Sequence, residues 1–168
     1  MDEGDHGALW GHRRALEWCA QQDDRCVIME DDALPVADFV HLAQRWMDEY
    51  PDSLLSFYLG TGRPPQYQAQ IAHVMTYADE PGAALCLPQL IHGVCYSVPQ
   101  QHVAAVASLL PQIGAADFAV GNAWRAVTGQ HVVYPVRSLV DHDDLPSVER
   151  HPDGQKRTEV RRAWRLEA

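Results

Sequence analysis

The amino-acid sequence predicts an α/β fold in which helices flank a largely parallel β-sheet. Short apolar runs of strand length alternate with longer segments of helical periodicity, which is typical of this class. The 168 residues suffice for one domain with a real core, and no repeat or low-complexity linker divides them. We therefore expect a single domain over residues 1–150, followed by a basic C-terminal tail over 151–168.

Helices are predicted where apolar residues recur at spacings of three or four. The clearest helix covers 36–50, and Pro51 stands just beyond it, where helices commonly stop. Further helices are expected over 12–22, from Pro99 to about Leu110, and over 116–128, where Gly129 suits the C-terminal cap.

Strands are predicted for the short apolar runs over 25–30, 54–59, 91–98 and 131–136. The segment 66–90 stays ambiguous, since "IAHVMTYA" within it could form a strand or a short helix. In open α/β sheets, ligands bind beyond the carboxyl ends of the strands, which directs attention to the residues that follow each strand.

The charge of the chain is strongly negative overall but uneven. A formal net charge of -10 argues against a broad nucleic-acid-binding face. The last stretch is nevertheless basic, with Lys156, Arg157, Arg161, Arg162 and Arg165. This tail is either a solvated or frayed end or an arm that contacts phosphate.

Composition also indicates where the protein works. No apolar run approaches the roughly 20 residues that a membrane helix needs, and the acidic N-terminus lacks the pattern of a signal peptide. The four cysteines are scattered without CxxC spacing, as is typical of reduced, mostly buried thiols. A cytoplasmic protein without a membrane span is expected.

Two acidic stretches each follow a predicted strand. In "VIMEDDALP" the apolar run leads directly into Glu30, Asp31 and Asp32. Three adjacent carboxylates repel one another, and a hard divalent cation such as Mn²⁺ or Mg²⁺ would relieve that repulsion. The alternatives are a solvated acidic turn, or an Asp32 that only caps the helix starting near Pro35. The second stretch, "SLVDHDDLPS", offers His142 as a nitrogen ligand among further aspartates.

These motifs, taken in order, resemble a known family. "GHRRALEW", the apolar strand with its EDD turn, "HGVCYSVPQQHVAAV", "ADFAVGNAW" and "YPVRSLVDHDDLPS" are similar to successive motifs of GT-A glycosyltransferases of the lipopolysaccharide-modifying type (family 25). The combination also resembles small glycosyltransferase-like proteins of actinobacterial phages. The likeness runs from about residue 11 to 148, and each motif taken alone is weak.

The resemblance implies a metal-dependent transfer of a sugar from a nucleotide-sugar donor, a UDP-sugar first among the candidates. By the family's DXD pattern, Asp32 is the expected metal ligand. Asp31 is a second ligand or, with Glu30, contacts the sugar or ribose. His142 matches the family's late histidine at the metal or diphosphate.

Further roles follow from the same resemblance. Asp117 matches the family's candidate catalytic base, although a helix cap would explain it equally well. His12, Arg13 and Arg14 match the region that meets the diphosphate at the start of a helix. The acceptor is an unknown hydroxyl on a glycan, a protein or modified DNA.

The chain departs from the family pattern at its start, because the strand that normally precedes the first helix has no counterpart. A shortened GT-A-like protein that binds without turnover is therefore the first alternative. A metal-dependent phosphohydrolase is the second, since aspartates with a histidine also serve two-metal chemistry.

Overall fold

The computed structural model describes residues 6–80, 82–143 and 160–168. The helices in these residues are α1 (Ala8–Cys19), α2 (Phe39–Glu49), α3 (Pro65–Tyr77), α4 (Gln100–Ser108) and α5 (Ala116–Thr128). The strands are β1 (Ile28–Met29), β2 (Ala33–Pro35), β3 (Leu55–Ser56), β4 (Ala84–Leu87), β5 (Cys95–Ser97), β6 (Val132–Pro135) and β7 (Val140–His142).

The main sheet is mixed rather than parallel. Its strand order is β1-β5-β3-β6-β4, and β2 pairs with β7 in a separate two-stranded sheet. Only β3 and β6 pair in parallel, whereas the other three pairs of the main sheet are antiparallel. The α/β class is confirmed, but the prediction of a largely parallel sheet is wrong. A helix between two strands does not fix their relative direction. In this sheet β4 and β5 both run antiparallel to β3 and β6.

The pairing also decides which strand ends lie together. Strands β1, β3 and β6 run in one direction, and β5 runs between β1 and β3 in the other. The carboxyl ends of β1 and β3 therefore lie at the same end of the sheet as the first residue of β5. Residues that follow β1 can meet residues that precede β5 there.

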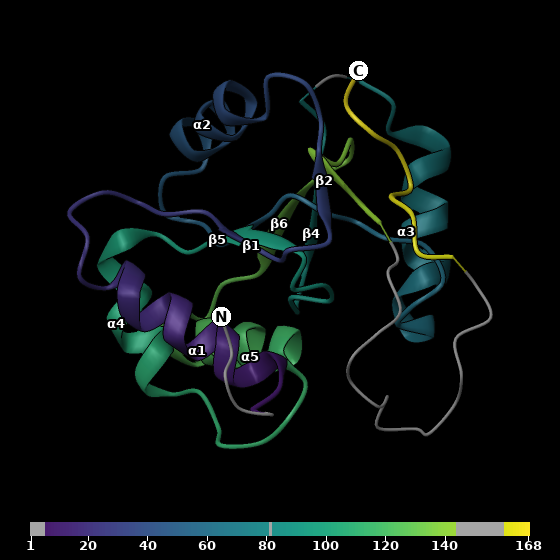
Figure 1. The fold of residues 1–168 in the computed structure, drawn as a ribbon. Coiled ribbons are helices and arrows are strands. Elements are labelled where there is room, and N and C mark those ends of the chain that lie inside the picture. Colours follow the sequence, from purple (N-terminus) through teal and green to yellow (C-terminus); the bar gives the residue numbers. More distant parts are fainter. Residues whose placement is uncertain (1–5, 81, 144–159) are drawn as a thin grey trace.

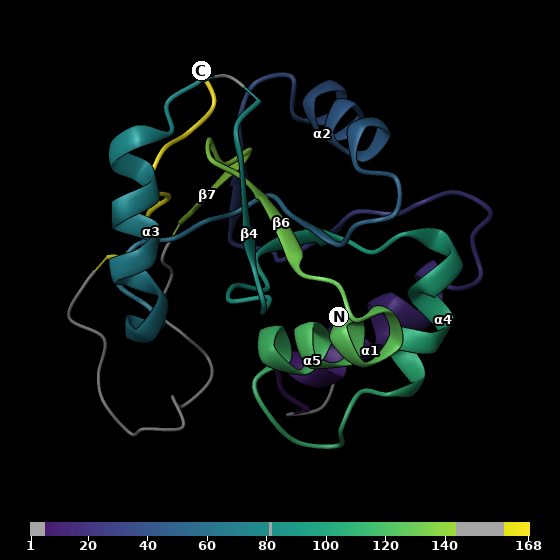
Figure 2. The ribbon, with the colours of Figure 1, turned by 180° about the vertical axis from the view of Figure 1, so that it is seen from behind.

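Helices cover both faces of the sheet. Figures 1 and 2 show α1, α4 and α5 grouped on one face and α2 on the other, with α3 to the side. Alternate residues of a strand pack into two different hydrophobic cores, because successive side chains of a strand point to opposite faces of the sheet. Tyr96 and Tyr134 belong to the core under α1, α4 and α5, while Cys95 and Val133 belong to the core under α2.

The helices follow the sequence pattern more closely than the strands do. Helix α5 has the predicted bounds, and Gly129 caps it in the left-handed conformation with a φ of 72°. The ambiguous "IAHVMTYA" lies in a helix except for its last residue, since α3 covers Pro65–Tyr77 and Ala78 is its C-cap. Helix α2 begins at Phe39 after Asp38, so Asp32 is not its cap. Strands β2 and β7 were not predicted, because each has only three residues and neither shows a full period of alternation.

The C-terminal strap, which we define as residues 160–168, lies against the domain. Isolated bridges join Gly60 to Ala163 and Ser138 to Leu166. Arg165 donates hydrogen bonds of 2.7 and 2.6 Å to the carbonyls of Met75 and Ala78, and Figure 1 shows the strap in yellow beside α3. The part of the predicted basic tail that is described is thus packed, while Lys156 and Arg157 lie outside the described residues.

None of the helices in the described ranges is both long and apolar enough to cross a membrane.

Candidate metal centre

The small β2–β7 sheet joins the two acidic stretches of the sequence. Its register places Ala33 opposite His142, and the Asp143 amide donates a 2.9 Å hydrogen bond to the Asp32 carbonyl. Asp32 is thereby set beside His142, with Oδ2 of the aspartate 3.3 Å from Nε2 of the histidine. Residues far apart in the sequence thus meet at one point.

Glu30 is the third member of this group. Its amide donates to the Val94 carbonyl at 2.9 Å, which extends the pairing of β1 with β5 by one residue. The Ala33 amide then donates to the Glu30 carbonyl at 3.2 Å and closes a turn around Asp31 and Asp32. One potential ligand atom each from Glu30, Asp32 and His142 lie within 4.8 Å of one another.

The donor set fits a divalent cation. Two carboxylates and one imidazole suit Mn²⁺ better than Mg²⁺, which prefers oxygen ligands throughout. Oδ1 of Asp32 is buried and has no hydrogen-bond partner among the described residues. Because an unsatisfied buried carboxylate oxygen is costly, this atom is well suited to receive a cation.

His12 holds Glu30 in place. The imidazole is buried, with Nε2 3.1 Å from Oε1 of Glu30 and Nδ1 3.0 Å from the Tyr96 hydroxyl. A carboxylate ligand supported by a second hydrogen-bonding side chain is a common arrangement around protein-bound metals. His12, predicted to meet a diphosphate, therefore lies in the site as a support for Glu30.

Electrostatics favour an ionised Glu30. Burial alone would raise its pKa, but the hydrogen bond from His12 and the surrounding cationic groups outweigh that effect. The pKa of Glu30 is therefore held below its ordinary value, and the carboxylate carries the charge that a cation requires.

Gly93 permits the close approach of these groups. A Cβ at this position would lie 3.0 Å from Cε1 of His12 and 3.2 Å from Oε1 of Glu30. Both distances are shorter than ordinary van der Waals contact. The sequence pattern gave Gly93 no role, because the helix and strand that meet at it are separated by most of the domain.

His92, just before β5, was also missed by the sequence reasoning. Its ring packs edge to face on Tyr58 with the centroids 5.1 Å apart, and its Nε2 is buried without a hydrogen-bond partner among the described residues. Burial lowers the pKa of His92 to about 4, so the ring is neutral at physiological pH. The same residue opens the "HGVCYSV" motif, and that position was the available signal.

Asp117 lies near the site on the first turn of α5. Burial raises its pKa to about 6, and the charge of Glu30 contributes in the same direction. The N-cap of α5 is Ala115, while Oδ1 of Asp117 accepts a 2.7 Å hydrogen bond from the Phe118 amide. Asp117 is thus not the N-cap residue, although it does bond to the first turn.

Three predicted residues do not join this group. Asp31 is exposed at the tip of the turn. Arg13 donates to the carbonyls of Leu110 and Pro111 at 2.9 and 2.7 Å. Arg14 pairs with Glu17 at 2.6 Å on the surface. Both arginines therefore have partners other than Glu30 and Asp32.

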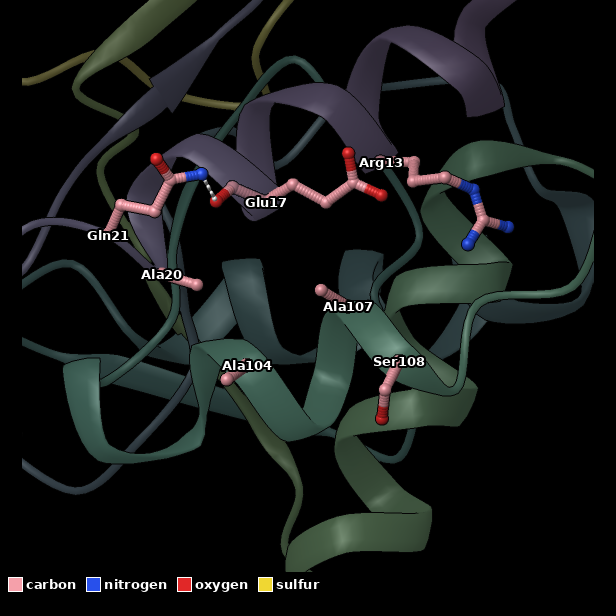
Figure 3. A pocket seen from close by; sticks show the side chains of 7 residues that line it. All are labelled: Arg13, Glu17, Ala20, Gln21, Ala104, Ala107 and Ser108. Carbon is pink, nitrogen blue, oxygen red and sulfur yellow. Dashed lines mark hydrogen bonds between the residues drawn. The ribbon is translucent and has the colours of Figure 1, made fainter.

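Figure 3 shows where Arg13 lies instead. It lines a shallow groove of about 440 Å³ between α1 and α4, whose floor is made by alanines such as Ala104 and Ala107. None of the three candidate ligands lines this groove. The site and the groove are therefore separate features of the described surface.

Comparisons with models of known protein families, with curated proteins and with solved structures find no match to this chain.

Proposed function

We propose that the protein is a GT-A-like glycosyltransferase that moves a sugar from a nucleotide donor to a hydroxyl acceptor, with a divalent cation held by Glu30, Asp32 and His142. The convergence of these three side chains from two separate acidic stretches carries the proposal. The sequence resemblance supplies the reaction class, and the donor set favours Mn²⁺ over Mg²⁺.

A bound cation would supply Lewis-acid stabilisation of the negative charge that develops on a diphosphate leaving group. The side chains of this chain have distinct tasks around it. Glu30 and Asp32 provide anionic oxygens, and His12 fixes the orientation of Glu30 through its 3.1 Å contact.

Asp117 is the proposed base that takes the proton from the acceptor hydroxyl. A pKa of about 6 leaves its carboxylate ionised at neutral pH and close to the value at which general bases work best. Perturbed carboxylates of this kind gather at functional sites.

The donor and the location belong to the same proposal. A UDP-sugar is the first donor to test, and the acceptor is a glycan, a protein or modified DNA. We place the reaction in the cytoplasm, in keeping with four described cysteines that are all free thiols.

A second candidate function is a GT-A-like protein that binds a nucleotide sugar without turnover. The observation that favours it is that both carboxylates already have positive or hydrogen-bonding neighbours, namely His12 at Glu30 and Arg161 at Asp32. A phosphohydrolase is less well supported, since two-metal chemistry needs a second ion and the described residues offer one ligand group.

Asp32→Asn tests the metal assignment, and Asp31→Asn is its matched control. The two substitutions remove the same charge from neighbouring residues. Asp32 lies with Glu30 and His142, whereas Asp31 is exposed beside them. We expect Asp32→Asn to weaken Mn²⁺ binding by calorimetry at least roughly tenfold, with the Asp31 variant close to the wild type. Equal affinities in the two variants would refute the assignment.

Release of UDP from a panel of UDP-sugars, with and without acceptor, then separates the two candidate functions. Turnover that depends on Mn²⁺ supports the transferase. Tight binding of the Mn²⁺–donor complex without any nucleotide release would support the binding protein instead.

A further inference from the structure

The C-terminal strap is hydrogen-bonded to two segments of the domain, one of which is the strand that carries His142. The Thr61 amide donates to the Arg162 carbonyl at 2.8 Å, and the Trp164 amide donates to the Leu59 carbonyl at 2.9 Å. The Ala163 amide donates to Oδ1 of Asp141 at 2.8 Å. These bonds fix the strap between the segment after β3 and strand β7, which carries His142.

This anchoring brings Arg161 to the ligand group. Its Nη2 lies 3.9 Å from Oδ2 of Asp32, and the side chains are only 24% and 19% exposed. The separation is too long for a hydrogen bond between those two atoms, so they attract through charge.

We infer that Arg161 and the cation bound by Glu30, Asp32 and His142 together form a receptor for a diphosphate, in which the anion lies against both positive groups. The inference rests on the proposed function and extends it by adding a residue of the basic tail to the ligand site.

The sign of its charge gives Arg161 opposite effects on the cation and on the anion. A guanidinium beside Asp32 repels a divalent cation that enters the same carboxylate group, so Arg161 opposes binding of the ion alone. A diphosphate reverses this effect, because its oxygens accept charge-assisted hydrogen bonds from the guanidinium while they also contact the ion. The ion and the anion therefore bind cooperatively, and Arg161 is a source of that coupling.

Arg161→Gln provides a test in which two affinities move in opposite directions. We expect Mn²⁺ alone to bind the variant roughly three- to tenfold more tightly than the wild type, because a like charge has been removed. We expect UDP or inorganic pyrophosphate, added at saturating Mn²⁺, to bind about tenfold or more weakly. Uridine with Mn²⁺ should bind the two proteins equally. All these affinities are measured by calorimetry.

Two further variants control for charge and for folding. Arg161→Lys keeps the charge, so its affinity for Mn²⁺ should match the wild type while its affinity for pyrophosphate falls part of the way. Arg45→Gln removes the same charge from the exposed face of α2 and should change neither affinity. Thermal melting of each variant shows whether the strap still stabilises the domain.

The outcomes separate this inference from the proposed function. A wild type that fails to bind Mn²⁺ would overturn both. Mn²⁺ and pyrophosphate affinities that fall together in Arg161→Gln, or that both stay unchanged while the wild type binds normally, would overturn the inference alone.

Discussion

Asp117→Asn should make the protein more stable at neutral pH while it removes the proposed base. Burial raises the pKa of Asp117 from an ordinary value of 3.8 to about 6, so the folded state binds the proton more tightly than the unfolded state does. Protonation at this residue therefore stabilises the fold below the unfolded pKa, and that stabilisation is lost as the pH rises through about 6.

The size of the effect follows from the shift. A difference of about two pKa units corresponds to about 3 kcal/mol, since one unit is worth 1.36 kcal/mol. The shift already includes the favourable hydrogen bond from the Phe118 amide to the carboxylate, and asparagine keeps an oxygen for that amide. We therefore expect a gain of about 3 kcal/mol at pH 7.5, or roughly 6–12 °C in melting temperature for a chain of this length.

Melting curves of the wild type and Asp117→Asn between pH 4 and 8 provide the assay. The two curves should lie close together near pH 4, diverge as the pH rises from about 4 to 6, and stay separated by a nearly constant amount above pH 6. Asp23→Asn, an exposed control with the same change of charge, should follow the wild type. A variant that is no more stable than the wild type at pH 7.5 would refute the claim that burial opposes ionisation.

The same variant bears on catalysis. Loss of a general base slows a reaction by about 10²–10⁴-fold, whereas donor affinity should change little because a base acts in the transition state. Equal losses in turnover and donor affinity would instead indicate that Asp117 has a structural role in α5.

The remaining predictions concern packing. Gly93→Ala should weaken Mn²⁺ binding roughly three- to tenfold while the fold survives, because its Cβ displaces His12 and Glu30. Gly11→Ala is the control, because Gly11 is exposed in α1 and a Cβ there would have nothing within 4 Å. It should keep Mn²⁺ binding and gain about 0.5–1 kcal/mol of stability. Equal Mn²⁺ affinities in the Gly93 and Gly11 variants would contradict the steric argument. Arg25→Met should lower the free energy of unfolding by about 2–4 kcal/mol in urea titrations, since the guanidinium makes five hydrogen bonds, four of them partly buried, and its removal leaves those acceptors unsatisfied. A loss below about 0.5 kcal/mol would show that water replaces those bonds.

The periodic parts of the sequence predicted the fold best. Helix α5 was found to the residue, because a full amphipathic pattern lies between an acidic first turn and a glycine cap. The strands were located only approximately, since β1 and β3 have two paired residues each. Strand direction could not be predicted, because it depends on whether the connecting segment returns the chain to the same end of the sheet or to the opposite end.

The candidate site was predicted in part for a related reason. Asp32 and His142 were expected as metal ligands from the resemblance and from their places after apolar runs, whereas Glu30 was expected to contact the sugar or ribose and instead lies with these two side chains. Asp32 was the first expected ligand and Asp31 an alternative second one, and the turn that leaves Asp31 exposed and half-buries Asp32 separates the two. Arg13, expected at a diphosphate, donates to the carbonyls of Leu110 and Pro111 just after α4, which only the packed structure brings within reach.

The sequence by itself determined the α/β class of the fold, its helices and the kinds of side chain available for binding a cation, because these depend on local composition and periodicity. The tertiary structure alone decided which of those side chains meet. The β2–β7 pairing brings His142 to Asp32, and the C-terminal strap brings Arg161 to the same carboxylate. Such meetings depend on contacts between residues distant in sequence, which no local pattern encodes.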